Sequence, residues 1–499
     1  MSSEKVGKEI QSQYRLAKVL GVVAVVASAA AQEYGAGINY VAVNSLSVYP
    51  AMTSLVPLAM FVAGILLIPK TYLYARFSRV VSKSGATYVW TSRTLHPLIG
   101  FIVIFGWWVG VTAAMGFLAF TVGTTSAQLL VALGIKSGAW LSTRLGHLAI
   151  GLAVIWLIFS LHYSGIRNYG YFVIAMLALI LITASTVMIY GFTTPSSLFI
   201  SAASNVIHST PTQPSVPPLT FNSFFGTVTL FMFAYGGISA ATLLGGETRN
   251  PNRDVPRGIV YGWLVALILF TLVALAVFSV APWWVVIDLI KSKASFYATV
   301  PGIITLVAPP AVGAFVTIVT TVILAKTIAP EMMESSRLLF SWSQDSILPS
   351  IFTHVNRFRA PDAALIASAI LGSLFLAEAT LIGWSIGVVI RSVTLVIAFM
   401  FVGLGAIREA FKRGPNKADW EKWVSSKSSV AAGVAAVIVG LILIPTVLVS
   451  KGAFIAFQPW FQLLVTVIVG ALFYAISSYR MRKSGINLTK EILERIPLE

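Results

Sequence analysis

The sequence predicts an all-α membrane protein with twelve transmembrane helices, and three observations support this fold class. The chain of 499 residues is 57% hydrophobic and only 10% charged, whereas soluble domains carry roughly 25% charged residues. It contains twelve apolar stretches, each near the roughly 20 residues that a helix needs to cross a bilayer core of about 30 Å. Its basic residues gather in alternate connections between these stretches.

The twelve spans follow one another along the chain without a large soluble insertion. The first stretch is too long for a cleaved signal peptide and lacks a small-residue cleavage site, so we expect it to be a true span. The spans are expected at residues 17–44, 51–76, 98–131, 146–163, 171–193, 221–245, 257–282, 310–341, 361–378, 380–406, 429–450 and 456–479.

The distribution of lysine and arginine predicts the orientation of the spans. Of the 34 basic residues, 26 lie on one side of the predicted membrane, 5 on the other and 3 within spans. The positive-inside rule places the richer side in the cytoplasm, so both termini are expected there, in the cell membrane. The connections are then a cytoplasmic N-terminus (1–16), an uncharged extracellular loop rich in Ser, Thr and Pro (194–220), a cytoplasmic loop (407–428) and a cytoplasmic tail (480–499).

Several function classes are excluded by composition and motifs. The net charge of +17 is dispersed between apolar spans, so it does not form the continuous basic face that nucleic-acid binding requires. There is no cysteine, and the five histidines are scattered, so neither a metal centre nor a cofactor is expected. No nucleophile elbow, HExxH motif or phosphate-binding loop is present, so the chain is predicted not to be an enzyme and to depend on a gradient rather than on ATP.

Two spans carry dense interruptions. The first contains QEYGAGIN at residues 32–39, and the sixth contains FAYGGIS at residues 233–239. These spans open two five-helix blocks, 17–193 and 221–406, and an odd number of spans gives the second block an inverted orientation. Irregular backbone in a membrane must face protein or a wet cavity, and corresponding breaks in inverted halves indicate a transporter binding site. The alternative is that the glycines only allow close helix packing.

Four motifs carry a family resemblance. Residues 246–257 read GETRNPNRDVPR, which resembles the E-T-x-N-P-x-R-D-x-P-R signature after the sixth helix of amino acid/polyamine/organocation (APC) transporters. Residues 336–340 (SRLLF), continuing to DSILP at 345–349, resemble the end of their eighth helix. SGATYVW at 84–90 is similar to the stretch before their third helix, and GAG at 35–37 to the G-x-G of their first. The matches are in the correct order and cover about residues 17–410.

The resemblance implies a LeuT-type fold of ten core helices in two inverted repeats, with two peripheral helices over 429–479. It also implies a secondary active transporter of amino acids or related amines, driven by a proton or sodium gradient or by exchange. Its partners would be the lipid bilayer, a small-molecule substrate and H⁺ or Na⁺. Polyamines, other organocations or nucleobases are alternative substrates within the same fold.

An amino acid presents a carboxylate and an ammonium group, and the breaks suit both. Amides opening the second half of the first span lie at the positive end of a helix dipole and suit the carboxylate, while carbonyls ending each first half-helix suit the ammonium. Phe233 and Tyr235 either cover the ligand or pack in the core. The candidate substrate-binding residues are Glu33, Gly35, Ala36, Gly37, Ile38, Phe233, Ala234, Tyr235 and Gly236.

Charges inside the spans are balanced. An unpaired charge at mid-bilayer costs about 2.5–3.5 kcal/mol, so such side chains are expected to face the interior and pair. Lys70 is expected instead to snorkel to the membrane surface. The six ionisable residues are Lys70, Lys326 and Arg391 against Glu33, Glu331 and Glu334.

These charges give the candidates for ion coupling. Glu33 either binds the substrate ammonium or carries a proton. Glu331 and Glu334 either bind the coupling proton or sodium, with Ser335 as a further sodium ligand, or form a static network with Lys326 and Arg391. No other metal is expected.

Three departures from the APC pattern leave the coupling ion open. Ser239 stands where many members have a glutamate, Arg76 replaces a frequent glutamate, and the fifth span has no lysine. A rival from another class is an ion-translocating subunit of a membrane complex, which also uses charged residues on broken helices. That rival does not account for the motif at 246–257 or for the paired breaks.

Overall fold

The computed structural model consists of α-helices with short π- and 3₁₀-helical segments, and it has no strand among the residues it describes. The apolar composition explains this, because hydrocarbon cannot hydrogen-bond to the backbone and each spanning segment must satisfy its own N–H and C=O groups. The described residues are 16–132, 138–141, 143–292, 294, 296–382, 385–411, 424, 426–449, 455 and 458–494.

Ten continuous segments in the described chain are long and apolar enough to cross a membrane. Their bounds follow the predicted spans closely; for example, the span predicted at 98–131 is a helix from Pro97 to Ala132. The ten segments are η2, α4 and α5 (Pro50–Leu55, Val56–Leu66, Ile68–Val80), α7 (Pro97–Ala132), α9 (Arg144–Tyr163), α10 (Ile166–Thr193), α14 (Pro251–Val280), α17 (Pro310–Gln344), α18 (Asp362–Ile382), α19 (Ser385–Phe411), α21 with η5 (Lys427–Leu443, Ile444–Val447) and α22 (Pro459–Lys483).

The other two predicted spans are interrupted at the predicted glycines. In the first, α2 (Val22–Glu33) ends before Gly35, a π-helix η1 (Gly37–Val41) follows, and α3 (Ala42–Val48) completes the segment. In the sixth, α12 (Phe221–Phe231) gives way to turns over residues 232–237 before α13 (Ile238–Leu243). Neither segment holds a continuous helix of spanning length, which is why the structure shows ten such helices where the sequence predicts twelve spans.

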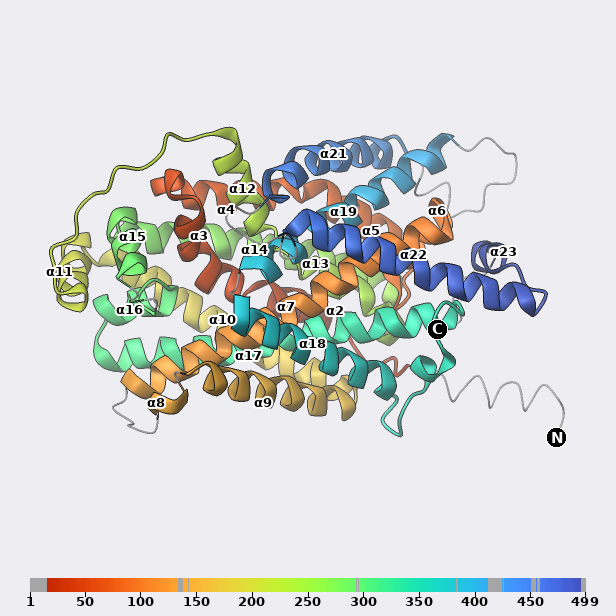
Figure 1. Cartoon of the computed structure of the whole chain (residues 1–499), viewed down its shortest axis with the longest axis horizontal. Coiled ribbons are helices and arrows are strands. Elements are labelled where there is room, and N and C mark those ends of the chain that lie inside the picture. The colour runs from red at the N-terminus through yellow and green to blue at the C-terminus, as the bar shows by residue number, and fades with distance from the viewer. Residues whose placement is uncertain are drawn as a thin grey trace.

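Short helices lie at the two ends of the bundle. Figure 1 shows α11 (Ser196–Ile207), α15 (Trp283–Lys291) and α16 (Val300–Val307) at one end, and α6 (Ala86–Thr94) and α23 (Leu488–Glu494) at the opposite end. This separation agrees with the predicted alternation, since the first three connect odd-numbered to even-numbered spans. Residues 194–220 were expected to be a loop, and α11 shows that part of this connection is helical. Most of the predicted loop 407–428 lies outside the described residues.

The N-terminal end of α2 is hydrogen-bonded to the segment that follows α13. The carbonyl of Glu247, in η3 (Gly245–Glu247), accepts hydrogen bonds from the amides of Val19 and Leu20, each at 3.0 Å. The Arg249 amide donates to the carbonyl of Leu20 at 2.9 Å. These bonds join the two interrupted segments at the start of α2, about 15 residues before its break.

Candidate functional site

The two interruptions meet inside the bundle. A Cβ atom added to Gly37 would lie 2.5 Å from the Cβ and 2.6 Å from the Cα of Ala234, so only glycine allows the two backbones to approach this closely. A Cβ on Gly35 would lie 2.5 Å from the hydroxyl of Thr327 on α17. The four residues from Gly35 to Ile38 are all buried. The glycines predicted to break the helix therefore also bring η1, the α12 break and α17 together.

The carbonyl end of α2 is occupied by a cation. The ammonium of Lys326 on α17 donates a hydrogen bond of 2.9 Å to the carbonyl of Tyr34, the residue that follows α2. The side-chain amide of Asn39 donates to the carbonyl of Gly35 at 2.9 Å. The Gly35 carbonyl also accepts the backbone amide of Asn39 at 3.2 Å, whereas Lys326 supplies a donor to a carbonyl at the end of α2, where helical partners run out. Glu33 is the last residue of α2, and its side chain lies outside the described part of the structure.

The two aromatic residues of the α12 break face different neighbours. Phe233 packs edge-on against Phe117 of α7, with ring centroids 5.5 Å apart, and Tyr40 of η1 contacts the same Phe117 ring at 6.3 Å. Tyr235 is fully buried, and its hydroxyl donates to the Met60 carbonyl of α4 at 3.1 Å. Phe233 therefore lies between the two interruptions and α7, whereas Tyr235 is held by α4.

A buried ion cluster lies beside the α12 break. Nη2 of Arg391, on α19, lies 3.0 Å from Glu334 Oε2 and 3.3 Å from Glu331 Oε2, both on α17. The guanidinium lies 5.2 Å from the centre of the Trp107 ring, and a Cβ on Gly236 would be 3.2 Å from Nη2. Two further donors of Arg391, Nε and Nη1, make no hydrogen bond within the described structure. At the edge of the break, the cluster thus combines paired charges with two hydrogen-bond donors of Arg391 that are unused within the described residues.

The chain matches the family model described as "Amino acid permease" over residues 18–482. The chain belongs to the amino acid permease family. This confirms the resemblance to APC transporters, and the protein is a multi-pass membrane transporter of amino acids or related substrates rather than an enzyme. The ten apolar helices agree with this assignment.

Curated relatives of this permease carry transporter names. The branched-chain amino acid permease BcaP of Bacillus subtilis is 25% identical over 351 residues, which cover 65% of this chain and 69% of the relative. BcaP of Lactococcus lactis subsp. cremoris is 24% identical over 379 residues, covering 70% and 72%. A methylthioribose transporter of B. subtilis is 26% identical over 319 residues, covering 61% and 63%.

The structure gives contacts for Ser335 and Lys326 of the permease, both of which were grouped with the carboxylates of α17. The Ser335 hydroxyl accepts a hydrogen bond of 2.9 Å from Trp108 and lies 2.8 Å from the Ser368 hydroxyl, so it faces α7 and α18 rather than Arg391 on α19. The Lys326 ammonium contacts the Tyr34 carbonyl at the end of α2. Among the described residues, no group of three or more His, Cys, Asp or Glu side chains is arranged to hold a metal ion.

The prediction that Lys70 reaches the membrane surface is wrong. Its side chain is fully buried, and the ammonium lies 5.3 Å from the centre of the Tyr74 ring and 5.9 Å from that of Trp107. It therefore points into the bundle, toward the same Trp107 that covers Arg391, and does not snorkel. Aromatic faces that attract a cation compensate for part of its lost hydration.

Two further buried ion pairs join segments that lie far apart in the sequence. Glu247 of the 246–257 motif binds Arg337 of the 336–340 motif through two hydrogen bonds of 2.5 and 3.2 Å, and both side chains are buried. Asp345, at the end of α17, forms a bidentate pair with Arg93 of α6, whose Nη1 and Nη2 donate to the two carboxylate oxygens at 2.7 and 2.8 Å. The sequence showed that Glu247 and Arg337 are charged. No spacing rule could show that they pair, because they lie 90 positions apart.

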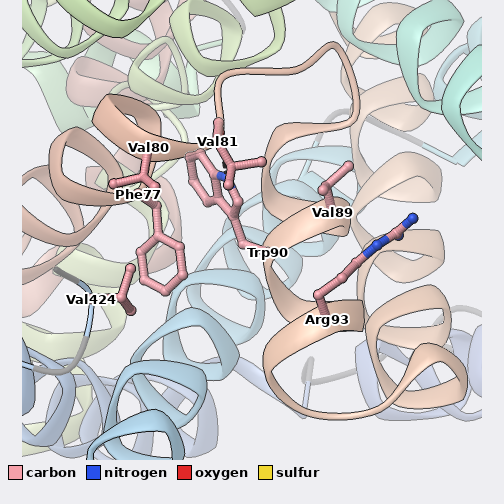
Figure 2. A pocket seen from close by; sticks show the side chains of 7 residues that line it. All are labelled: Phe77, Val80, Val81, Val89, Trp90, Arg93 and Val424. Carbon is pink, nitrogen blue, oxygen red and sulfur yellow. Dashed lines mark hydrogen bonds between the residues drawn. The ribbon is translucent and has the colours of Figure 1, made fainter. Parts of the chain in front are cut away.

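A small pocket near α6 is not a substrate site. Its volume is about 20 Å³, close to that of a single water molecule. Its lining is apolar apart from Arg93, and Figure 2 shows the guanidinium of Arg93 pointing away from Phe77 and Val424. The pocket is lined by Phe77, Val80, Val81, Val89, Trp90, Arg93 and Val424.

Proposed function

We propose that this permease is a secondary active transporter that moves amino acids or related amines across the cell membrane by alternating access. The proposal includes a LeuT-type arrangement of twelve spans, with inverted repeats at 17–193 and 221–406 and both termini in the cytoplasm. The observation that carries it is the close contact of Gly37 with Ala234, because two helix interruptions meeting inside a membrane bundle are typical of a substrate site.

The substrate would lie across the two breaks. Backbone amides of Gly35, Ala36, Gly37 and Ile38 would bind its carboxylate, because they open the second half of the interrupted segment. Carbonyls of Glu33, Phe233, Ala234 and Gly236 would bind its ammonium group. Phe233 would cover the ligand on the α7 side, whereas Tyr235 would maintain the shape of the break through its hydrogen bond to Met60. Branched-chain amino acids are the first substrates to test, since two relatives are named as permeases for them.

The position of Lys326 bears on the coupling ion. Carbonyl ends of broken helices are where transporters hold Na⁺ or H⁺. In this permease the Lys326 ammonium already donates to such a carbonyl, at Tyr34. This placement favours a proton gradient or exchange over a sodium ion bound at the same point. Glu33, Glu331 and Glu334 remain the candidate proton carriers, and a sodium ion near Glu334 and Ser335 is disfavoured by the orientation of the Ser335 hydroxyl.

The test is uptake into proteoliposomes that contain only the purified protein. Labelled leucine, isoleucine and valine would be offered with an imposed proton gradient, a sodium gradient or unlabelled substrate inside. We expect uptake of at least one amino acid with a proton gradient or by exchange. Polyamines, nucleobases and methylthioribose form the second panel, and uptake confined to this panel would overturn the amino acid assignment. No uptake without added protein subunits would favour the rival class of a complex subunit.

A further inference from the structure

A second cavity lies at the membrane boundary, away from the site described above. It has a volume of about 340 Å³ and lies between the start of α2 and the start of α10. At its inner edge the helices nearly touch, because a Cβ on Gly170 would be 2.8 Å from a Leu20 methyl group. The lining consists of residues 19–24, Arg167, Gly170, Tyr171, Ile174 and Arg249.

The position of the lining in the chain places the cavity at headgroup level. Arg167 is the second residue of the span α10, and Arg249 lies two residues before the span α14 begins at Pro251. Both arginines therefore lie where a membrane span meets the aqueous phase. Val23 and Tyr171 are 58% and 63% exposed, and both belong to apolar helices, so the cavity is open toward the surrounding lipid.

The cavity is positively charged. Arg167 and Arg249 are exposed, and neither forms an ion pair with any carboxylate in the described part of the chain. The Arg167 guanidinium lies 6.0 Å from the centre of the Tyr171 ring. Lys18 and Arg253, which are also exposed, lie in the chain close to residue 19 and to Arg249 respectively. Unpaired guanidinium groups present planar sets of N–H donors that match phosphate oxygens.

We propose that this cavity binds an anionic phospholipid. Arg167 and Arg249 hold the headgroup phosphate, and an acyl chain lies along the exposed apolar side chains of Val23 and Ile174. The combination of charge and exposed hydrocarbon at one opening favours an amphiphile over free inorganic phosphate, which would use only the charged part. Basic pockets between transmembrane helices are suited to anionic headgroups for the same reason.

The test uses full-length protein in detergent and measures lipid binding by native mass spectrometry. Phosphatidylglycerol is titrated against phosphatidylcholine with the same acyl chains, and inorganic phosphate is a separate competitor. The variant is R167Q/R249Q. The control is R480Q/R482Q, which removes two exposed arginines at the end of another span, α22, which contributes no residue to this lining. Unchanged melting temperatures of both variants would show that they are folded.

We expect phosphatidylglycerol to bind more tightly than phosphatidylcholine to the unmodified protein. R167Q/R249Q should weaken phosphatidylglycerol binding about 25-fold, at roughly fivefold for each arginine, whereas R480Q/R482Q should leave the cavity's affinity unchanged. Equal binding of the two lipids, or an equal loss in both variants, would overturn the proposal. Displacement of the lipid by millimolar phosphate would show that the cavity is a general anion site instead.

Discussion

Replacing Gly37 by alanine is expected to separate the two helix interruptions. The added methyl group would lie 2.5 Å from the Cβ and 2.6 Å from the Cα of Ala234. Carbon atoms in contact prefer separations of about 3.5–4.0 Å, so the two backbones must move apart by about 1 Å. Overpacking of this kind costs about 1–3 kcal/mol of stability. The same movement would displace the amides that we propose bind the substrate carboxylate.

The Gly37→Ala substitution is also expected to weaken substrate binding. Loss of one hydrogen bond to a charged group costs about 1.5–3 kcal/mol, which corresponds to roughly 10- to 150-fold weaker binding. The assay is the apparent affinity for substrate in proteoliposome uptake, together with the melting temperature of the purified variant. Gly21→Ala is the matched control, since a Cβ at Gly21 meets no atom within 4 Å.

A double variant tests the geometric reasoning. Ala234→Gly removes the nearer of the two contacts but leaves the Cα of residue 234 only 2.6 Å from the new methyl group. Gly37→Ala with Ala234→Gly should therefore recover only part of the lost affinity. The reasoning is refuted if Gly37→Ala is folded and binds substrate within twofold of the unmodified protein.

Three further substitutions test the charges around the breaks. Glu33→Gln should abolish uptake or change its substrate range, and unchanged uptake, range and pH profile would exclude a role for this carboxylate. Arg391→Met leaves two buried carboxylates without their partner, so we expect a loss of about 3–5 kcal/mol in stability, measured as a lower melting temperature and partly restored by adding Glu334→Gln. A full melting temperature in the single variant would contradict the buried pairing. Lys326→Met removes the donor to the Tyr34 carbonyl and should either abolish uptake or make it sodium-dependent; uptake with the original rate and ion dependence would show that this ammonium has no part in coupling.

The main architecture could be predicted because the bilayer imposes simple rules. Span bounds follow from the length of the apolar stretches. The breaks at Gly35–Gly37 and Gly236–Gly237 follow from clustered glycines, which weaken a helix because they lose the most backbone entropy on folding. The helix α11 was missed because residues 194–220 carry no charge and are rich in Ser, Thr and Pro, which indicates a loop.

The partners of the buried charges could not be predicted from spacing. Lys70 was expected to reach the membrane surface, but the direction of its side chain depends on Tyr74 and on Trp107 of another helix. Glu331 and Glu334 lie three residues apart on one helix, but this spacing did not show which charges of other helices would reach them, such as Arg391 of α19. The partner of a buried charge depends on how neighbouring helices are rotated about their axes. The sequence of a single helix does not determine that rotation.

The hydrogen bonds at the N-terminal end of α2 have a mechanical consequence. Glu247 holds α2 through its backbone carbonyl and α17 through its carboxylate, which binds Arg337. Glu247 therefore links α2 to α17, with its backbone hydrogen-bonded to one and its side chain ion-paired to the other. Any tilt of α2 relative to α17 must either carry Glu247 along and pull it from Arg337, or release the amides of Val19 and Leu20. In the first case a buried ion pair is broken, and in the second two backbone hydrogen bonds are broken together, so α2 should move in a single cooperative step rather than by gradual bending.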